Sequence, residues 1–260
     1  MTRVALLQVD VGAEKSPEER TQHVLALIRQ QVGQCDVVCL PELWTVGAFS
    51  SSLMKSSAVD RTSSFVSDLG DAARLAKVWL HAGSFIERDG DQLFNTSAVF
   101  RPDGSIAAFY RKIHLFGFDT GEAVLLSGGE DPVKIDQTPL GMLGLTTCYD
   151  LRFPELFRAL VAQGVETFIV PAGWPASRLH HWQILLQARA IENQAWVIAC
   201  NATGLSGEVQ LAGHSIVVNP LGMIVAQAGA QESVLYVDLD MAEVTTWRSE
   251  FPALGDRMLD

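Results

Sequence analysis

The sequence predicts an α/β protein in which a mixed sheet system, arranged as two sheets, is covered on the outside by helices. Buried apolar runs alternate with amphipathic helical segments along the 260 residues, which is typical of α/β proteins. Tight turns join some strands directly, so antiparallel pairs must accompany the parallel ones. No linker, low-complexity segment or repeat interrupts the chain, and we therefore expect a single domain.

The first half of the chain is expected to open with a strand and a helix. Ser16 is a suitable N-cap, Pro17 stands in the first turn, and Gly33 ends the helix. Strands are predicted over residues 4–9, 36–40, 78–86, 93–100 and 105–110, and helices over 17–32 and 60–76. Residues 111–129 have little periodicity and many charged and aromatic side chains, so we interpret them as a functional loop.

The second half continues the alternation. Strands are predicted over residues 142–145, 165–170, 195–201, 214–218, 224–227 and 234–238, and helices over 155–163 and 177–193. Pro154 opens the first of these helices, where proline is tolerated. A glycine-rich loop follows residue 201, and the tail, residues 241–260, begins as a helix and ends loosely.

Composition excludes several classes of protein. Apolar residues make up 48% of the chain and charged residues 19%, which indicates a globular rather than a disordered protein. The formal net charge of −11 argues against nucleic acid or an anionic membrane surface as a partner. No apolar run approaches the roughly 20 residues of a membrane span, and the N-terminus has no signal-peptide core. The four cysteines lack a disulfide spacing, so we expect a reduced, cytoplasmic protein.

Cys148 is the residue around which the candidate chemistry is organised. It ends a buried strand, and a short turn with Asp150 and Arg152 leads into the next helix. Open α/β sheets place their sites at such strand ends, and a nearby helix N-terminus would favour the thiolate. By itself, a cysteine in a strand is more often a small buried hydrophobe. The residues that accompany Cys148 therefore decide its interpretation.

Glu42 and Lys112 occupy the same kind of place as Cys148, a strand end or the loop after it. Each alone is compatible with an ordinary surface charge. Together the three supply a coherent chemistry, because a carboxylate can take the proton of a thiol and return it to a departing amine. An ammonium and the backbone N–H after the cysteine can stabilise the oxyanion of the intermediate. Asp150 and Arg152 are suited to bracing the turn, although each is also compatible with a surface charge.

Three segments resemble the signatures of the nitrilase (carbon–nitrogen hydrolase) superfamily, in the family's order and over essentially the whole chain. They are Leu40-Pro41-Glu42, Tyr110-Arg111-Lys112-Ile113-His114-Leu115-Phe116 and Cys148-Tyr149-Asp150-Leu151-Arg152-Phe153-Pro154-Glu155. The resemblance implies a four-layer α-β-β-α sandwich formed by residues 1–260. It implies Glu42 as general base, Lys112 as oxyanion stabiliser and Cys148 as nucleophile, with a thioester intermediate. It also implies no metal, no cofactor, and a homodimer in which the tail, 241–260, makes contacts.

A second glutamate often follows the lysine in amidases of this family, and Glu122 fits that position. Such a carboxylate would hold Lys112 and orient the amide nitrogen of the substrate. Glu130 is the rival candidate, and a plain loop charge is the other alternative. We favour Glu122 because its loop is otherwise apolar and a buried acid needs partners.

The segment that begins at Cys148 resembles the omega-amidases and deaminated-glutathione amidases, whereas true nitrilases have Cys-Trp-Glu there. The resemblance implies hydrolysis of the terminal amide of a small carboxylate-bearing molecule to an acid and ammonia. Substrates of that kind are 2-oxo acid omega-amides, such as 2-oxoglutaramate, and deaminated glutathione. A nitrilase, an N-carbamoyl amidohydrolase and a non-catalytic binding protein on the same fold are the alternatives.

A substrate carboxylate needs a cation or N–H donors in its pocket. Arg178 follows the loop expected to face Cys148 and is the candidate, although an exposed arginine in a first helical turn fits equally well. Candidate walls of the pocket, each also compatible with core packing, are Phe116, Phe118, Tyr149 and Trp174. The pair His180-His181 lacks a partner histidine or an adjacent acid, so we expect no zinc site.

Overall fold

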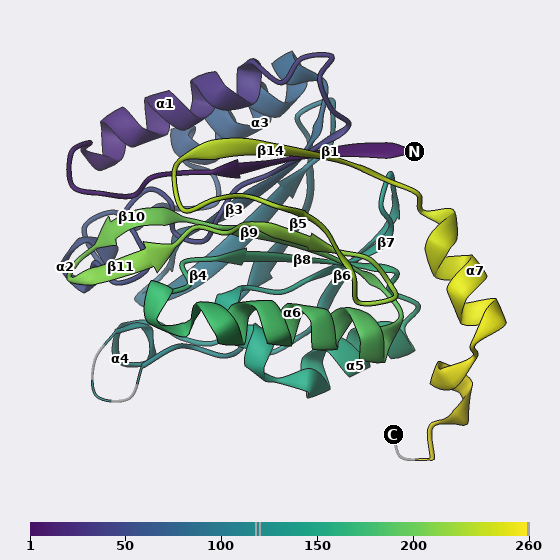
Figure 1. Ribbon diagram of the computed structural model, residues 1–260. Helices are drawn as coiled ribbons and strands as arrows, with labels where there is room; N and C mark the ends of the chain where they lie inside the picture. Colours follow the sequence, from purple (N-terminus) through teal and green to yellow (C-terminus); the bar gives the residue numbers. More distant parts are fainter. Residues whose placement is uncertain (118, 120, 259–260) are drawn as a thin grey trace.

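The computed structural model describes residues 1–117, 119 and 121–258 and has the predicted α/β architecture (Figure 1). Two six-stranded sheets lie face to face. Helices α1 (Pro17–Arg29) and α3 (Ser64–Ala76) cover the outer face of the first sheet. Helices α5 (Pro154–Ala162) and α6 (Leu179–Asn193) cover the outer face of the second. The molecule is thus a single four-layer α-β-β-α sandwich, as the family resemblance implies.

Each sheet has parallel strands in its middle and antiparallel strands at its edges. The first, in the order β14-β1-β2-β3-β4-β5, comprises β1 (Thr2–Gln8), β2 (Val37–Cys39), β3 (Trp79–Asp89), β4 (Gln92–Phe100), β5 (Ile106–Arg111) and β14 (Ser233–Leu239). The second, in the order β13-β12-β9-β8-β7-β6, comprises β6 (Val133–Thr138), β7 (Gly141–Leu145), β8 (Thr167–Ala172), β9 (Trp196–Asn201), β12 (Ile216–Val218) and β13 (Ile224–Gln227). Strands β1-β2-β3 and β7-β8-β9 are parallel, so their carboxyl ends meet along one edge of each sheet.

The remaining elements are short or peripheral. They are the hairpin β10 (Thr203–Ser206) and β11 (Val209–Ala212), helices α2 (Ser51–Met54), α4 (Glu122–Leu125) and α7 (Ala242–Glu250), and the 3₁₀ helices η1 (Cys148–Arg152), η2 (Ala176–Arg178) and η3 (Ala253–Asp256). Helix α7 runs along the side of the sandwich toward the C-terminus (Figure 1). No described helix has the length and apolar character needed to cross a membrane.

Apolar side chains fill every interface between layers. In β1, Ala5 and Leu7 pack with the residues under α1 and α3, while Val4 and Leu6 pack between the two sheets. All four are fully buried, because both faces of this strand are covered. That double burial explains why β1 appears in the sequence as a continuous apolar run rather than as an alternating one.

Several element predictions were wrong at their boundaries or missed an element. The helix predicted over 60–76 begins only at Ser64, after an irregular segment. The edge strand β6 was missed because its apolar residues alternate with polar ones over only six positions. The glycine-rich loop predicted after residue 201 contains the hairpin β10–β11, and the loop predicted over 111–129 contains α4. Phe118 and residues 259–260, which entered the pocket and tail predictions, lie outside the described residues.

Candidate functional site

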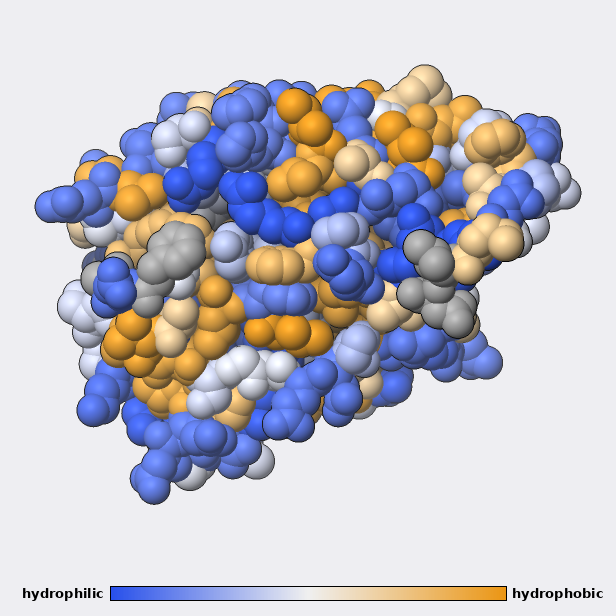
Figure 2. Space-filling model, turned by 90° about the horizontal axis from the view of Figure 1, so that it is seen from below, coloured by the Kyte–Doolittle hydropathy of each residue, from blue (hydrophilic) through white to orange (hydrophobic). Residues whose placement is uncertain are grey.

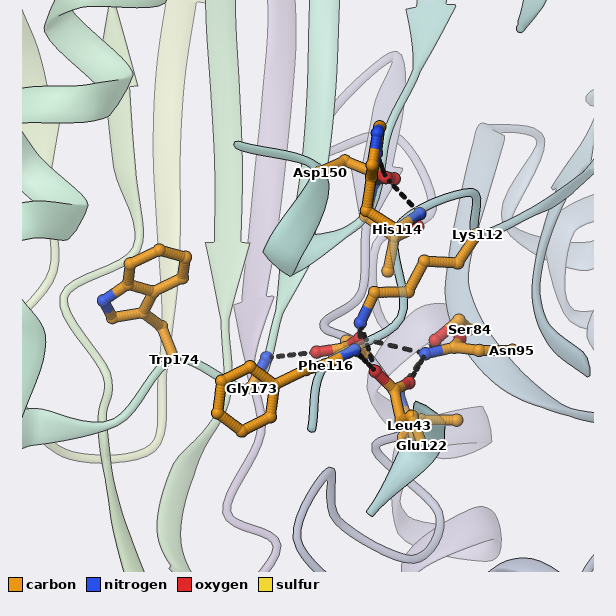
Figure 3. A network of polar contacts seen from close by, with 12 residues as sticks. Leu43, Ser84, Asn95, Lys112, His114, Phe116, Glu122, Asp150, Gly173 and Trp174 are labelled. Atoms are coloured by element: carbon orange, nitrogen blue, oxygen red, sulfur yellow. Dashed lines mark hydrogen bonds and ion pairs between the residues drawn. The ribbon is translucent and has the colours of Figure 1, made fainter. Parts of the chain in front are cut away.

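The predicted reactive residues come together where strands of both sheets end. Glu42 follows β2 and Lys112 follows β5 in the first sheet, while Cys148 follows β7 in the second. Glu122 comes from the short helix α4 in the loop after Lys112. Figure 3 shows Lys112, Asn95 and Glu122 converging on one network of polar contacts. Sequence positions far apart are thus joined in one buried cluster.

Lys112 lies between two carboxylates. Its Nζ is 2.7 Å from Glu42 Oε1 and 2.6 Å from Glu122 Oε2, and the side chain is 1% exposed. Burial alone lowers the pKa of this lysine, but the negative charges of Glu122 and Glu42 outweigh it and hold the pKa well above its ordinary value. Lys112 is therefore a permanently charged ammonium with two anionic partners.

Glu42 is fixed through both of its oxygens. Oε1 accepts from Lys112 and, at 2.9 Å, from Asn95 Nδ2, while Oε2 accepts from the backbone N–H of Gly173 at 2.9 Å. Gly173 follows β8, so this bond ties the two sheets together across the site. A Cβ at position 173 would lie 2.5 Å from the Cβ of Ala48, so only glycine allows this close approach.

Glu122 is buried beside Lys112, whereas the rival Glu130 is exposed. Its Oε2 also accepts from the backbone N–H of Phe116 at 3.1 Å, and its Oε1 accepts from Asn95 Nδ2 at 2.5 Å. Burial raises the pKa of the Glu122 carboxyl and Lys112 opposes the shift, leaving the pKa above its ordinary value. Two acids thus share one ammonium, and burial favours protonation of Glu122.

Cys148 opens η1 with a left-handed backbone, φ 46°, which a residue with a Cβ rarely adopts. Its side chain is 9% exposed. Burial raises the pKa of the thiol well above its ordinary value, the charge of Glu42 adds to the effect, and Lys112 opposes it. The expectation that a helix N-terminus would favour the thiolate is therefore wrong, because burial and a facing carboxylate dominate. The resting group is a thiol that needs a base.

Asp150 braces the turn, as the sequence predicts. Its Oδ2 accepts from the backbone N–H of Thr147 at 2.8 Å and from the hydroxyl of Tyr110 at 2.7 Å. Its Oδ1 accepts from the backbone N–H of His114 at 3.0 Å. The residues flanking Lys112 are thereby fastened to the residues flanking Cys148.

A small pocket opens at Cys148. Its lining residues are Phe49, Phe116, Cys148, Tyr149, Arg152, Gly173, Trp174, Pro175 and Arg178. Every described residue predicted to contact substrate is therefore present in the wall. The Arg178 guanidinium lies 5.5 Å from the centre of the Phe116 ring, and the Arg152 guanidinium lies 4.9 Å from that of Trp174. Among the described residues of the wall, two are cations and none is a carboxylate.

The sequence predictions missed two polar residues of the site. Asn95, in the middle of β4, looked like an ordinary strand residue and gave no signal. Arg152 was assigned to bracing the turn, yet it lines the pocket, with its guanidinium over the Trp174 ring. Its position four residues after the nucleophile, at the end of η1, was the available signal. Among the described residues, no group of three or more His, Cys, Asp or Glu side chains could hold a metal ion.

Comparison with known sequences points to one family. The family model described as carbon-nitrogen hydrolase matches residues 3–249. The 2-oxoglutaramate amidase of Paenarthrobacter nicotinovorans is 42% identical, over 99% of this chain and 90% of that protein. The 2-oxoglutaramate amidase of Bacillus subtilis (strain 168) is 35% identical, over 97% of this chain and 96% of that protein.

Solved structures agree with the sequence comparison. Nit3 of Saccharomyces cerevisiae, a member of branch 10 of the nitrilase superfamily, superposes with a TM-score of 0.89 at 31% identity, covering 99% of this chain and 97% of Nit3. A variant of the amidase from Nesterenkonia sp. AN1 superposes with a TM-score of 0.86 at 26% identity, covering 99% of this chain and 94% of the amidase. That variant carries the acetamide moiety of fluoroacetamide, covalently added at its active-site cysteine.

Proposed function

Because the chain belongs to the carbon–nitrogen hydrolase family, and is therefore a hydrolase of carbon–nitrogen bonds, we propose that it hydrolyses the terminal amide of a small carboxylate-bearing substrate. The proposed products are the acid and ammonia, and 2-oxoglutaramate is the leading substrate. The observation that carries the chemistry is the buried ion cluster of Lys112, Glu42 and Glu122 beside Cys148. The relatives named 2-oxoglutaramate amidase support the substrate.

The proposed reaction begins at the Cys148 thiol. Glu42 removes the thiol proton as sulfur attacks the amide carbon, which suits a thiol whose pKa is raised by burial and by the facing carboxylate. Lys112 and the backbone N–H of Tyr149 stabilise the oxyanion of the tetrahedral intermediate. Glu42 returns the proton to the nitrogen, the carbon–nitrogen bond breaks, and ammonia leaves a thioester. A water, deprotonated by Glu42, then releases the acid.

Glu122 has two proposed tasks. It holds Lys112 through their 2.6 Å contact, so the ammonium keeps its place while Glu42 exchanges protons. Its raised pKa also favours a protonated form that can orient the amide group of the substrate. Neither task requires Glu122 to act as the base itself.

The far end of the substrate is assigned to the two arginines of the pocket wall. Arg178 and Arg152 both line the pocket that contains Cys148, in a chain whose formal net charge is −11. Positive groups in the wall of a protein this acidic favour a substrate that carries its own negative charge. Tyr149, Trp174 and Phe116 supply the apolar walls around the carbon chain.

The protein is further proposed to act as a cytoplasmic homodimer. The four cysteines are free, which suits a reducing compartment. Figure 2 looks onto the face covered by α5 and α6 and shows apolar patches among hydrophilic side chains. On α6, Ile184 is 61% exposed and Ile191 is 55% exposed. This face and the tail, 241–260, are the proposed contacts, and sedimentation velocity tests the assembly.

Ammonia release from a panel of substrates tests the proposed activity. The panel is 2-oxoglutaramate, 2-oxosuccinamate, deaminated glutathione, glutamine, an N-carbamoyl amino acid and an aliphatic nitrile, with wild type and Cys148→Ala. Cysteine-dependent turnover of a 2-oxo acid amide is the expected result. Turnover of only the nitrile, or of only the N-carbamoyl compound, would identify the protein as a nitrilase or as an N-carbamoyl amidohydrolase of the same superfamily. No turnover, together with an unreactive Cys148, would favour the alternative that the chain is a non-catalytic binding protein on the same fold.

A further inference from the structure

Asn95 is a polar residue of the site that has no role in the reaction proposed above. It lies in β4, is 1% exposed, and directs its side-chain nitrogen at both carboxylates. Nδ2 donates to Glu42 Oε1 at 2.9 Å and to Glu122 Oε1 at 2.5 Å (Figure 3). The opposite orientation of the amide would point its oxygen at two carboxylates, so the orientation of the side chain is fixed by charge.

The oxygen of the same amide has no partner. Asn95 Oδ1 is buried and accepts no hydrogen bond from any described residue. A buried acceptor without a donor lowers stability, so packing alone does not account for an asparagine at this position. The two donated bonds are what this side chain contributes.

Those bonds go to two acids that share a single cation. Glu42 and Glu122 both contact Lys112, so whenever both are ionised two negative charges face one positive charge. Like charges at this distance compete for a proton. The neutral Asn95 amide donates to an oxygen of each acid. It therefore lowers the electrostatic free energy of the second negative charge and fixes the distance between the two acids.

We propose that Asn95 is a positioning residue that holds Glu42 and Glu122 together through one amide group and so places Glu42 to receive the proton of Cys148. The inference rests on the proposed function, because it takes Glu42 to be the base. Asn95 does not touch the substrate and acts only through the two carboxylates.

The pH profile of kcat/KM for Asn95→Leu tests the proposal. Leucine keeps the approximate volume and removes both donors. Each hydrogen bond to a charged group accounts for about a 10- to 100-fold effect, so kcat/KM falls by at least about 10-fold. Loss of a donor raises the pKa of a carboxylate, and a base must be unprotonated to act. The acid limb of the profile therefore moves to higher pH.

Two further variants make the test specific. Asn95→Asp has the same shape but adds a third carboxylate, so its acid limb moves further than that of Asn95→Leu. Asn193→Leu is the matched control, because Asn193 in α6 is also fully buried, donates through Nδ2 and leaves Oδ1 without a partner. It lies outside the ion cluster, so the control variant should lose stability without moving the acid limb.

Alkylation of Cys148 by iodoacetamide gives the same test without a substrate. Its rate against pH follows the base that takes the thiol proton, so Asn95→Leu should move that profile upward as well. If wild type releases no ammonia from any amide, the proposed function fails, and alkylation alone then decides the task of Asn95. A profile for Asn95→Leu that superposes on wild type, or that moves no more than Asn193→Leu, overturns the proposal. If Asn95→Leu does not fold, Asn95→Ser, which keeps one hydroxyl donor, should give a smaller shift in the same direction.

Discussion

Replacement of Lys112 by methionine should destabilise the protein in a strongly pH-dependent way. The ammonium is 1% exposed and contacts Glu42 at 2.7 Å and Glu122 at 2.6 Å. Removing one partner of a buried ion pair costs about 3–5 kcal/mol, because a charge is left without compensation. In a protein of this size each kcal/mol corresponds to about 2–4 °C, so the melting temperature at pH 8 should fall by about 6–20 °C.

The pH dependence of this loss has a definite sign. In Lys112→Met, burial and the neighbouring Glu42 raise the folded pKa of the Glu122 carboxyl above the unfolded value, and the opposing ammonium is gone. A group whose folded pKa is raised contributes stability below its unfolded pKa and loses it as pH rises through the folded pKa. The difference from wild type should therefore be largest at pH 8 and should shrink toward pH 5.

Thermal unfolding followed by circular dichroism at pH 8 and pH 5 measures both effects. Lys134→Met is the control, because Lys134 pairs at 2.8 Å with Asp136, whose side chain is 61% exposed. Such surface pairs contribute about 0–1 kcal/mol, so the control should melt within a few degrees of wild type at both pH values. If Lys112→Met matched the control, or if its loss were the same at both pH values, the charged cluster described above would be wrong.

Two further variants test the pocket and the base. Arg152→Gln should raise KM for 2-oxoglutaramate about 10- to 100-fold, because one charge-assisted contact is lost, and should leave a neutral aliphatic amide unaffected. Steady-state kinetics on both substrates check this. An equal rise in KM for both would contradict the assignment of Arg152 to carboxylate binding. Glu42→Gln should slow iodoacetamide labelling of Cys148 by about 100-fold at neutral pH, because the thiol loses its base. Peptide mapping by mass spectrometry follows the label, and unchanged labelling would contradict the assignment of Glu42.

The sequence was sufficient for the family, the fold and the class of enzyme. Strands covered on both faces appear as continuous apolar runs, so β1, β2 and β8 were visible without a structure. Glu42 and Cys148 could be singled out because each comes shortly after a buried strand, β2 or β7. Short motifs that end strands therefore carried more information than the charged residues of the loops.

Properties that depend on contacts across the fold could not be predicted. Asn95 acquires its importance from Glu42 and from Glu122, which belong to other parts of the chain. The direction of Arg152 depends on the 3₁₀ turn η1, which the local sequence does not fix. The raised pKa of the Cys148 thiol follows from burial and a facing carboxylate, neither of which is visible next to it in the sequence.

In the proposed mechanism, attack by Cys148 on the amide carbon leaves the acyl group on sulfur, and acid quenching followed by intact-mass spectrometry would detect that thioester directly. Wild type mixed with 2-oxoglutaramate should gain the mass of the substrate less ammonia, and peptide mapping should locate that gain on the peptide that contains Cys148. Cys148→Ala should gain nothing and release no ammonia. Turnover by Cys148→Ala at the wild-type rate, or an adduct on a different residue, would contradict the mechanism.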